Sequence, residues 1–128
     1  MSRDNVCLIV DDVEFDRRMM RRVLARTCPD MPLVVARTLT EARARLAERN
    51  VSILFLDNAL PDGMGIDLLA EMTADSRMCR IPVVLVSDFP SPFMYAKAQA
   101  AQVCEVWSKR EFVGASVRRI VQKHACLH

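Results

Sequence analysis

The sequence predicts an α/β fold in which helices cover both faces of a parallel sheet. Short apolar runs alternate along the chain with amphipathic helical patterns, and few residues are left between them. The run 53–56 is apolar throughout, which is typical of a strand buried on both faces. Because strand–helix–strand connections are right-handed, five such units give a doubly wound sheet. A length of 128 residues with 52% hydrophobic content indicates a single domain, residues 1–128.

The first strand, 6–10, ends at Asp11 and Asp12, directly before a helical pattern. Asp12 suits the cap of that helix, but a cap does not account for both carboxylates. An apolar stripe recurs at helical spacing and is expected to face the core. Its members are Phe15, Met19, Met20, Val23 and Leu24. Arginines fill the other positions, which favours a solvated face over a basic binding face.

The second strand is expected at 33–36. Thr38 and Glu41 have the spacing of a capping box, in which a hydroxyl and a carboxylate satisfy unpaired N–H groups at the start of a helix. Leu39, Ala42 and Leu46 then form an inward stripe, and Asn50 is expected to close this helix.

The third strand, 53–56, stops at Asp57, and the turn that follows contains Pro61, Gly63 and Gly65. Open α/β sheets place their ligand sites at the carboxyl ends of strands, so Asp57 is a candidate site residue. An aspartate also begins surface turns well, and this remains the simpler interpretation of Asp57 taken alone. Ile66, Leu68, Leu69 and Met72 mark the helix behind the strand.

The fourth strand, 83–86, stops at Ser87. A serine cap at Ser91, with proline at the first helical position, predicts a helix that runs to about Ala101. The fifth strand, 103–108, ends at Lys109. A final helix is expected to be lined by Phe112, Val113, Val117, Ile120 and Val121.

Composition excludes several classes of protein. The net charge of +2 is spread over helices that also carry acids, so neither a nucleic-acid nor a membrane partner is expected. The five cysteines are scattered without a CxxC pair, which argues against a disulfide framework or a thiolate metal site. The N-terminus lacks the apolar segment of a signal peptide, and no apolar run approaches the length that spans a bilayer. We therefore expect a cytoplasmic protein.

Polar side chains follow four of the expected strands at the same edge of the sheet. They are Asp11, Asp12, Asp57, Ser87 and Lys109. Three neighbouring carboxylates repel one another unless a cation joins them, and hard oxygen ligands in this number suit Mg²⁺, with Mn²⁺ as a substitute. Such a metal neutralises a phosphoryl group while one carboxylate attacks it as a nucleophile.

In these pieces the chain resembles the receiver domains of two-component response regulators. The matching pieces are Asp11 and Asp12 after the first strand, Asp57 with LPDGMG after the third, Ser87 after the fourth and Lys109 after the fifth. The resemblance covers about residues 6–121. It implies a flavodoxin-like (βα)5 fold with strand order 2-1-3-4-5, a topology whose standard examples include a member of this family.

The resemblance also implies a role for each site residue. Asp57 would accept a phosphoryl group from a histidine kinase or phosphotransfer protein. Asp12 would bind Mg²⁺ directly, Asp11 largely through water, and the backbone carbonyl of Ala59 would complete the protein ligands. Ser87 and Lys109 would contact the phosphoryl group. Such a chain catalyses only its own phosphorylation and dephosphorylation, so no turnover substrate is expected.

Two departures from the family pattern concern the residues that change position on phosphorylation. The lysine is usually followed by proline in a cis peptide, whereas Arg110 follows Lys109 here, and a cis bond without proline costs about 2.5–4 kcal/mol. The aromatic residue usual three positions before the lysine is replaced by Val106, with Trp107 beside it. In the family that aromatic residue swings inward when the switch hydroxyl moves, and Phe89, Tyr95 or Trp107 would have to take over this role. For Trp107, packing under the last helix is the preferred interpretation.

Only residues 110–128 follow Lys109, too few for an effector domain, so a stand-alone receiver that signals by contact with an unknown downstream protein is expected. Phe89, Phe93, Met94 and Tyr95 form a candidate partner face, with core packing of their helix as the equal alternative. A pseudo-receiver that works without phosphorylation is the alternative function. A haloacid-dehalogenase-type phosphatase is disfavoured, because Ala59 stands where that family has its second aspartate.

Overall fold

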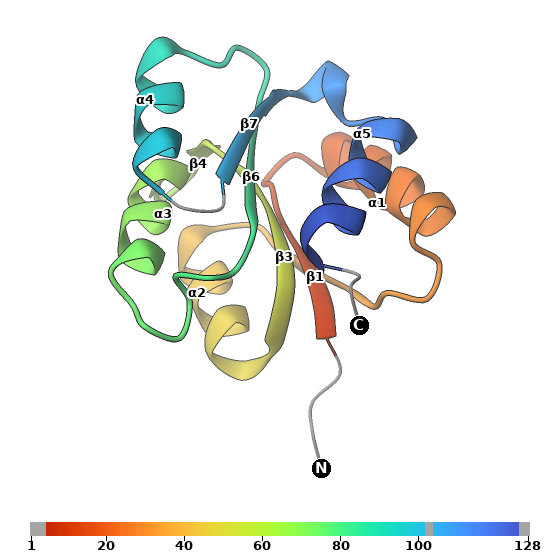
Figure 1. Cartoon of the computed structure of the whole chain (residues 1–128). Coiled ribbons are helices and arrows are strands. Elements are labelled where there is room, and N and C mark those ends of the chain that lie inside the picture. Colours follow the sequence, from red (N-terminus) through yellow and green to blue (C-terminus); the bar gives the residue numbers. More distant parts are fainter. Residues whose placement is uncertain (1–4, 102–103, 126–128) are drawn as a thin grey trace.

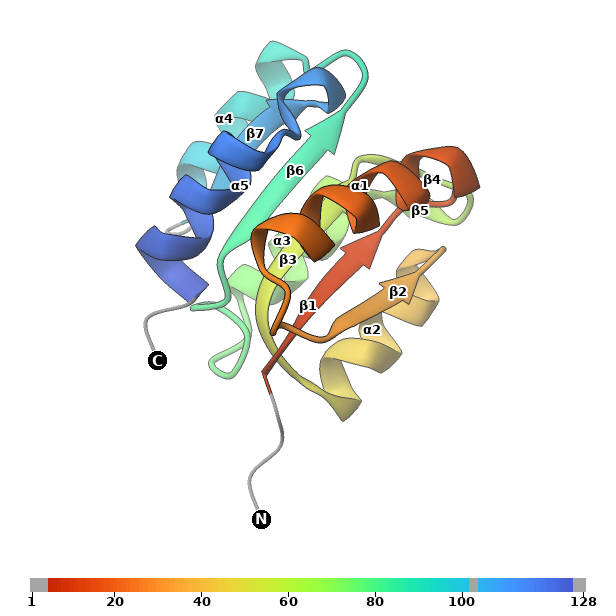
Figure 2. The ribbon, with the colours of Figure 1, turned by 90° about the vertical axis from the view of Figure 1, so that its right-hand side faces the viewer.

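Five parallel strands form the central sheet of the computed structural model, which describes residues 5–101 and 104–125. In spatial order these strands are β2 (Leu33–Ala36), β1 (Asn5–Val10), β3 (Asn50–Asp57), β6 (Val83–Ser87) and β7 (Cys104–Ser108). Counted along the chain this is the order 2-1-3-4-5, so the expected flavodoxin-like topology is confirmed (Figures 1 and 2). Val103, the expected start of the fifth strand, lies outside the described residues.

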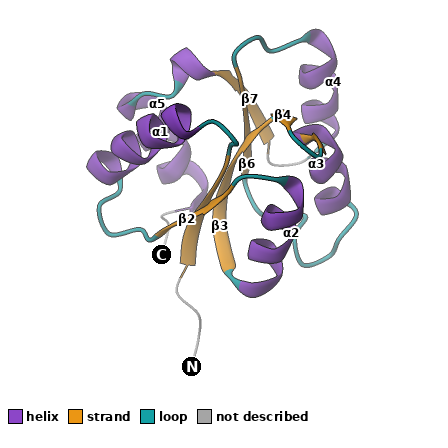
Figure 3. Ribbon diagram, turned by 180° about the vertical axis from the view of Figure 1, so that it is seen from behind, coloured by secondary structure: helices purple, strands orange, loops and turns teal. Residues whose placement is uncertain are grey.

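Helices cover both faces of this sheet. On one face lie α1 (Glu14–Thr27) and α5 (Gly114–Ile120), which the π-helical turn η2 (Val121–Ala125) extends. On the other lie α2 (Leu39–Glu48), α3 (Gly65–Thr73) and α4 (Pro92–Ala100), as Figure 3 shows from behind. A short 3₁₀ turn, η1 (Lys109–Glu111), connects β7 to the segment before α5.

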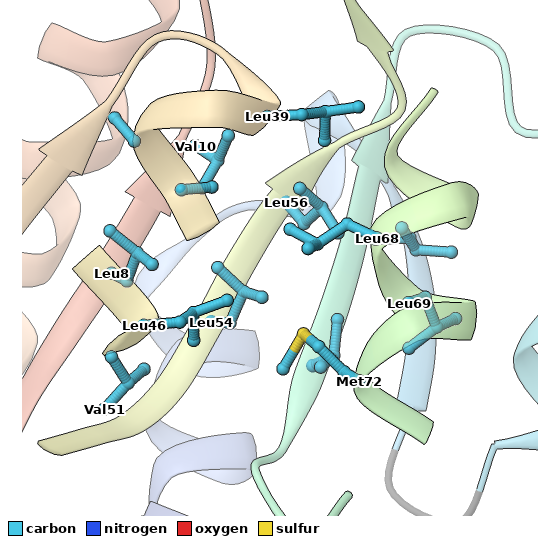
Figure 4. Packing of buried hydrophobic residues seen from close by; sticks show 14 of the residues in the cluster. Leu8, Val10, Leu39, Leu46, Val51, Leu54, Leu56, Leu68, Leu69 and Met72 are labelled. Carbon is cyan, nitrogen blue, oxygen red and sulfur yellow. The ribbon is translucent and has the colours of Figure 1, made fainter. Parts of the chain in front are cut away.

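Side chains of the sheet alternate between two cores. Along β1, Leu8 and Val10 face α2 and α3, whereas Cys7 and Ile9 face α1 and α5. Leu54 and Leu56 of β3 join the first core, which Figure 4 shows packed against residues of α2 and α3. This alternation, with both sets buried, is what a strand covered on both faces requires, and it explains why the run 53–56 has no polar member.

The loop after β3 is held by close backbone contacts. A two-stranded hairpin, β4 (Ala59–Leu60) and β5 (Gly63–Met64), was not expected from the sequence. A side chain at Gly65 would place its Cβ 2.5 Å from the Asp57 carbonyl oxygen, so only glycine allows α3 to begin this close to the end of β3. Asp62 accepts hydrogen bonds from the backbone N–H groups of Leu39 and Thr40, at 2.8 and 3.0 Å, and so ties this loop to the start of α2.

Several local expectations were wrong. Asn50 begins β3 instead of closing α2. Phe15 is 78% exposed, and the buried residues of α1 are Met20 and Leu24. Val113 is also exposed and precedes α5, although Phe112 beside it is buried.

The capping box at α2 is half confirmed. The Thr38 hydroxyl accepts from the Glu41 N–H, but Glu41 accepts from the N–H of Arg37, the residue before the cap. In the described ranges, no helix is long and apolar enough to cross a membrane.

Candidate functional site

The ends of β1 and β3 bring three carboxylates together at one edge of the sheet. Asp11, Asp12 and Asp57 each offer an oxygen atom, and these atoms all lie within 4.8 Å of one another. The two strands are adjacent and parallel, with Val10 paired to Leu56, so the residues that follow them come side by side. The acids predicted from separate stretches of the sequence therefore form one group of neighbouring carboxylates, which we call the acidic pocket.

Asp11 is the most deeply buried of these three acids and is fully buried. Its Oδ1 accepts a hydrogen bond from the Val13 N–H at 2.9 Å. Its Oδ2 receives no aligned hydrogen bond from any described residue, although the Lys109 ammonium lies 3.1 Å away. Burial raises the pKa of Asp11, and the Val13 N–H and the charge of Lys109 oppose that rise without cancelling it.

Asp57 is 6% exposed, and its Oδ1 lies 3.4 Å from the Ala59 N–H that donates to it. Burial, followed by the charge of Asp11, raises the pKa of Asp57 from 3.8 to about 6, against the opposing charge of Lys109. The negative form of this carboxylate is therefore unfavourable in the folded protein and would be favoured by an added cation.

Lys109 supplies the positive charge of the pocket, and its side chain is 9% exposed. Its ammonium contacts Asp16 most closely, lies 3.1 Å from Asp11 Oδ2 and is 3.7 Å from Asp57 Oδ2. Burial alone would lower the pKa of this lysine, but the hydrogen bond to Asp16 and the charges of Asp57 and Asp11 raise it, so the ammonium stays protonated.

Asp16 was missed in the sequence, where only the apolar stripe and the arginines of the first helix were interpreted. It lies in the first turn of α1, four residues before Met20 and eight before Leu24, the two buried residues of that helix. This spacing of four places Asp16 on the buried side of α1, and it is the signal that would have found the residue.

The remaining predicted site residues lie at or just after the ends of β1, β3 and β6. Asp12 is exposed and does not cap α1, whose N-cap is Val13. Ser87, half-buried at the end of β6, accepts a hydrogen bond from the Phe89 N–H at 3.3 Å. Ala59 is the first residue of β4, two residues after Asp57 in the sequence. Lys109 and Arg110 are joined by a trans peptide bond, since no described peptide is cis.

These residues fit a hard divalent cation. Carboxylate oxygens are the ligands that Mg²⁺ and Mn²⁺ prefer, and the pocket gathers three of them. The Lys109 ammonium is shared among Asp11, Asp16 and Asp57. The buried Oδ2 of Asp11 has no aligned donor among the described residues. Asp11, Asp12 and Asp57 are the residues that would hold such an ion.

The aromatic residues near the pocket divide into buried and exposed sets. Trp107 is 3% exposed and packs against Phe55 and Phe112, with ring centroids 6.0 and 5.9 Å away, so the packing interpretation of Trp107 is confirmed. Val106 is half-buried against the opposite core. Phe89, Phe93 and Tyr95 are 89%, 55% and 47% exposed, whereas Met94 and Ala98 are the buried residues of α4. Core packing therefore does not account for Phe93 and Tyr95.

Comparisons with known proteins agree with this geometry. The sequence model of the family described as "Response regulator receiver domain" matches residues 7–120. The two-component response regulator ORR13 of Oryza sativa subsp. japonica is 30% identical over 88 residues, which cover 68% of this chain and 70% of that protein.

Solved structures are similar over nearly the whole chain. The Mn²⁺-bound form of response regulator Rcp1 is 25% identical, with a TM-score of 0.77 and coverage of 91% of both chains. A two-component response regulator from Cytophaga hutchinsonii is 19% identical and shares the fold with a TM-score of 0.82, over 95% of this chain and 97% of that one. The chain belongs to the response regulator receiver domains, the phosphoacceptor signalling domains of two-component systems, which are not turnover enzymes.

Proposed function

We propose that Asp57 is the phosphoacceptor and takes its phosphoryl group from the phosphohistidine of a histidine kinase or phosphotransfer protein. One observation carries this assignment. Asp57 lies at the end of the central strand β3, buried yet next to Asp11, Asp12 and the Lys109 ammonium. A carboxylate in this position has a positive partner for an incoming phosphoryl group and neighbouring oxygens for a metal ion.

The chemistry follows from the residues present. A carboxylate oxygen of Asp57 attacks the phosphorus atom, the P–N bond breaks, and its electron pair returns to the imidazole of the donor. Asp11, Asp12, Asp57 and the backbone carbonyl of Ala59 would hold Mg²⁺, or Mn²⁺ in its place, which would neutralise charge on the transferring group. Lys109 would pair with one phosphoryl oxygen, and the Ser87 hydroxyl would donate a hydrogen bond to another.

Phosphorylation by a small donor tests this function without the cognate kinase. The protein is incubated with Mg²⁺ and phosphoramidate and then weighed by mass spectrometry. We expect the mass of one phosphoryl group to be added, and we expect chelation of the metal with EDTA to prevent the addition. An unchanged mass in the presence of Mg²⁺ would instead favour the pseudo-receiver, an interaction domain that works without phosphorylation.

We also propose that the signal leaves by protein contact through the segment after β6. Phe89, Phe93 and Tyr95 are exposed there, and exposed aromatic residues are enriched at protein interfaces. Ser87 connects this segment to the pocket, because its Oγ accepts from the Phe89 N–H in the unphosphorylated protein. A phosphoryl group that draws the Ser87 hydroxyl inward would break that bond.

This connection predicts a change in the backbone of residues 87–95. In an NMR titration with Mg²⁺ and beryllofluoride, a phosphoryl analogue, the amide resonance of Phe89 is expected to shift more than those of α2, whose helix packs on β1 and β2 away from Ser87. If the chemical shift of the Phe89 amide is unchanged while resonances of the acidic pocket shift, phosphorylation does not act on a partner through the segment after β6.

A further inference from the structure

The Lys109 ammonium lies off-centre in the acidic pocket. It contacts Asp16 most closely, approaches Asp11 Oδ2 at 3.1 Å and remains 3.7 Å from Asp57 Oδ2. The last distance is longer than a hydrogen bond between an ammonium and a carboxylate. The proposed phosphoacceptor is therefore the most distant of the three acids around this lysine.

An ammonium group has three N–H donors, and three carboxylates surround this one. Because the ammonium lies 3.7 Å from Asp57 Oδ2, it would have to move toward Asp57 to donate to a phosphoryl group there. Asp11 is fully buried directly after β1 and is itself one of the three candidate metal ligands, so its contact with Lys109 belongs to the pocket itself. Asp16 lies on α1, outside the group of three acids, and is the partner that Lys109 can release.

Asp16 is also fixed in position. Its helix is anchored one turn later by Met20, which is 1% exposed. The guanidinium of Arg17 donates to the Asp11 backbone carbonyl at 2.9 Å and so ties the start of α1 to the end of β1. Because these contacts hold α1, we expect an ammonium that moves to a phosphoryl oxygen to lose contact with Asp16.

We propose that Asp16 is a positioning residue that holds the Lys109 ammonium away from Asp57 until a phosphoryl group draws it across the pocket. This inference rests on the proposed function, in which Asp57 carries the phosphoryl group and Lys109 contacts it. Asp16 then sets the balance between the unphosphorylated and phosphorylated arrangements, because its contact with Lys109 is made only in the first. The opposite role, an anchor that steadies Lys109 for the phosphoryl group, would require both contacts at once.

Replacement of Asp16 by asparagine tests the inference, since asparagine keeps the shape and removes the charge. The affinity for beryllofluoride is measured by calorimetry at saturating Mg²⁺. The intrinsic fluorescence of Trp107, the single tryptophan of the chain and buried two residues before Lys109, is followed in parallel. We expect Asp16→Asn to bind the analogue about fivefold more tightly than the wild type, because a charged hydrogen bond to Lys109 no longer competes.

The matched control is Glu14→Gln. Glu14 lies in the same first turn of α1 and loses the same charge, but its carboxylate is exposed and pairs with Arg18 at 3.4 Å. An equal gain in both variants would show that only the net charge near the pocket matters and would overturn the inference. Unchanged or weaker binding by Asp16→Asn would overturn it as well.

A structure of the wild-type protein with Mg²⁺ and beryllofluoride gives a readout that does not depend on affinity. We expect the Lys109 ammonium on a fluorine atom and separated from Asp16. Contact with both at once would identify Asp16 as an anchor and refute the proposed role. Failure of the wild type to bind beryllofluoride counts against the proposed function itself, whereas binding with no change in Asp16→Asn counts against this inference alone.

Discussion

The Asp57→Asn variant is expected to gain no phosphoryl group and yet to be more stable than the wild type at neutral pH. The loss of phosphorylation follows because the amide is not a nucleophile toward phosphoramidate. The gain in stability follows because the buried negative charge of Asp57, next to Asp11, is removed. A rise of the pKa from 3.8 to about 6 corresponds to about 3 kcal/mol in the free energy of unfolding above pH 6.

The sign of the pH dependence follows from the same pKa. Asp57 holds its proton more tightly in the folded than in the unfolded chain, so the folded state binds more protons between about pH 4 and pH 6. The stability contributed by this group therefore falls as the pH rises through that range and is constant above it. Asp57→Asn lacks this pH-dependent loss of stability, so the difference in unfolding free energy between the variant and the wild type disappears toward pH 4.

Urea unfolding without metal at pH 4.5 and pH 7.5 measures the effect. Asp88→Asn is the matched control, because Asp88 is an exposed acid just beyond the end of the neighbouring strand β6. We expect that variant to accept phosphoryl normally and to change stability by less than about 0.5 kcal/mol. Equal stability of Asp57→Asn and the wild type at pH 7.5 would mean that the charge of Asp57 is not unfavourable in the fold.

Most of the fold was predictable because each strand of the five-stranded sheet carries its own local signal. The run 53–56 has no polar residue, since both faces of β3 are buried, and Asp57 marks its end. Parallel connections then bring the strand ends to one edge, which is why Asp11, Asp12 and Asp57 were expected to lie together. The direction and connection of the strands thus determine which residues meet at the edge of the sheet, and side-chain packing need not be known.

The rotation of α1 was not predictable in this way. Successive helical residues are about 100° apart, so stripes that begin at Phe15 or at Asp16 differ by one residue only. The apolar character of Phe15 favoured a stripe that includes it, but the buried residues of α1 are Met20 and Leu24, which lie one and two turns after Asp16. As a result Phe15 is exposed, and Asp16 faces Lys109, 93 residues away in the sequence.

Replacement of Lys109 by methionine is expected to destabilise the metal-free protein by about 3 kcal/mol at neutral pH. The ammonium is shared by Asp11, Asp16 and Asp57, and its loss leaves buried carboxylates without their positive partner. Methionine is of similar length and apolar, so packing is largely kept. The pKa values of Asp11 and Asp57, already raised, would rise further, so stability should recover as the pH falls and these groups become protonated.

Arg110→Met is the matched control, because it removes the same charge from the adjacent residue, which is exposed. We expect little change in that variant, whereas Lys109→Met should be stabilised by Mg²⁺ more than the wild type is, since the ion supplies the missing positive charge. Addition of Asp57→Asn should also restore much of the lost stability, because it removes one of the unpaired carboxylates. If Lys109→Met unfolds at the same urea concentration as Arg110→Met in the absence of metal, the three acids are not held together by this lysine. The attraction between the ammonium and these carboxylates would then be much weaker than the distances of 3.1 Å to Asp11 and 3.7 Å to Asp57 imply.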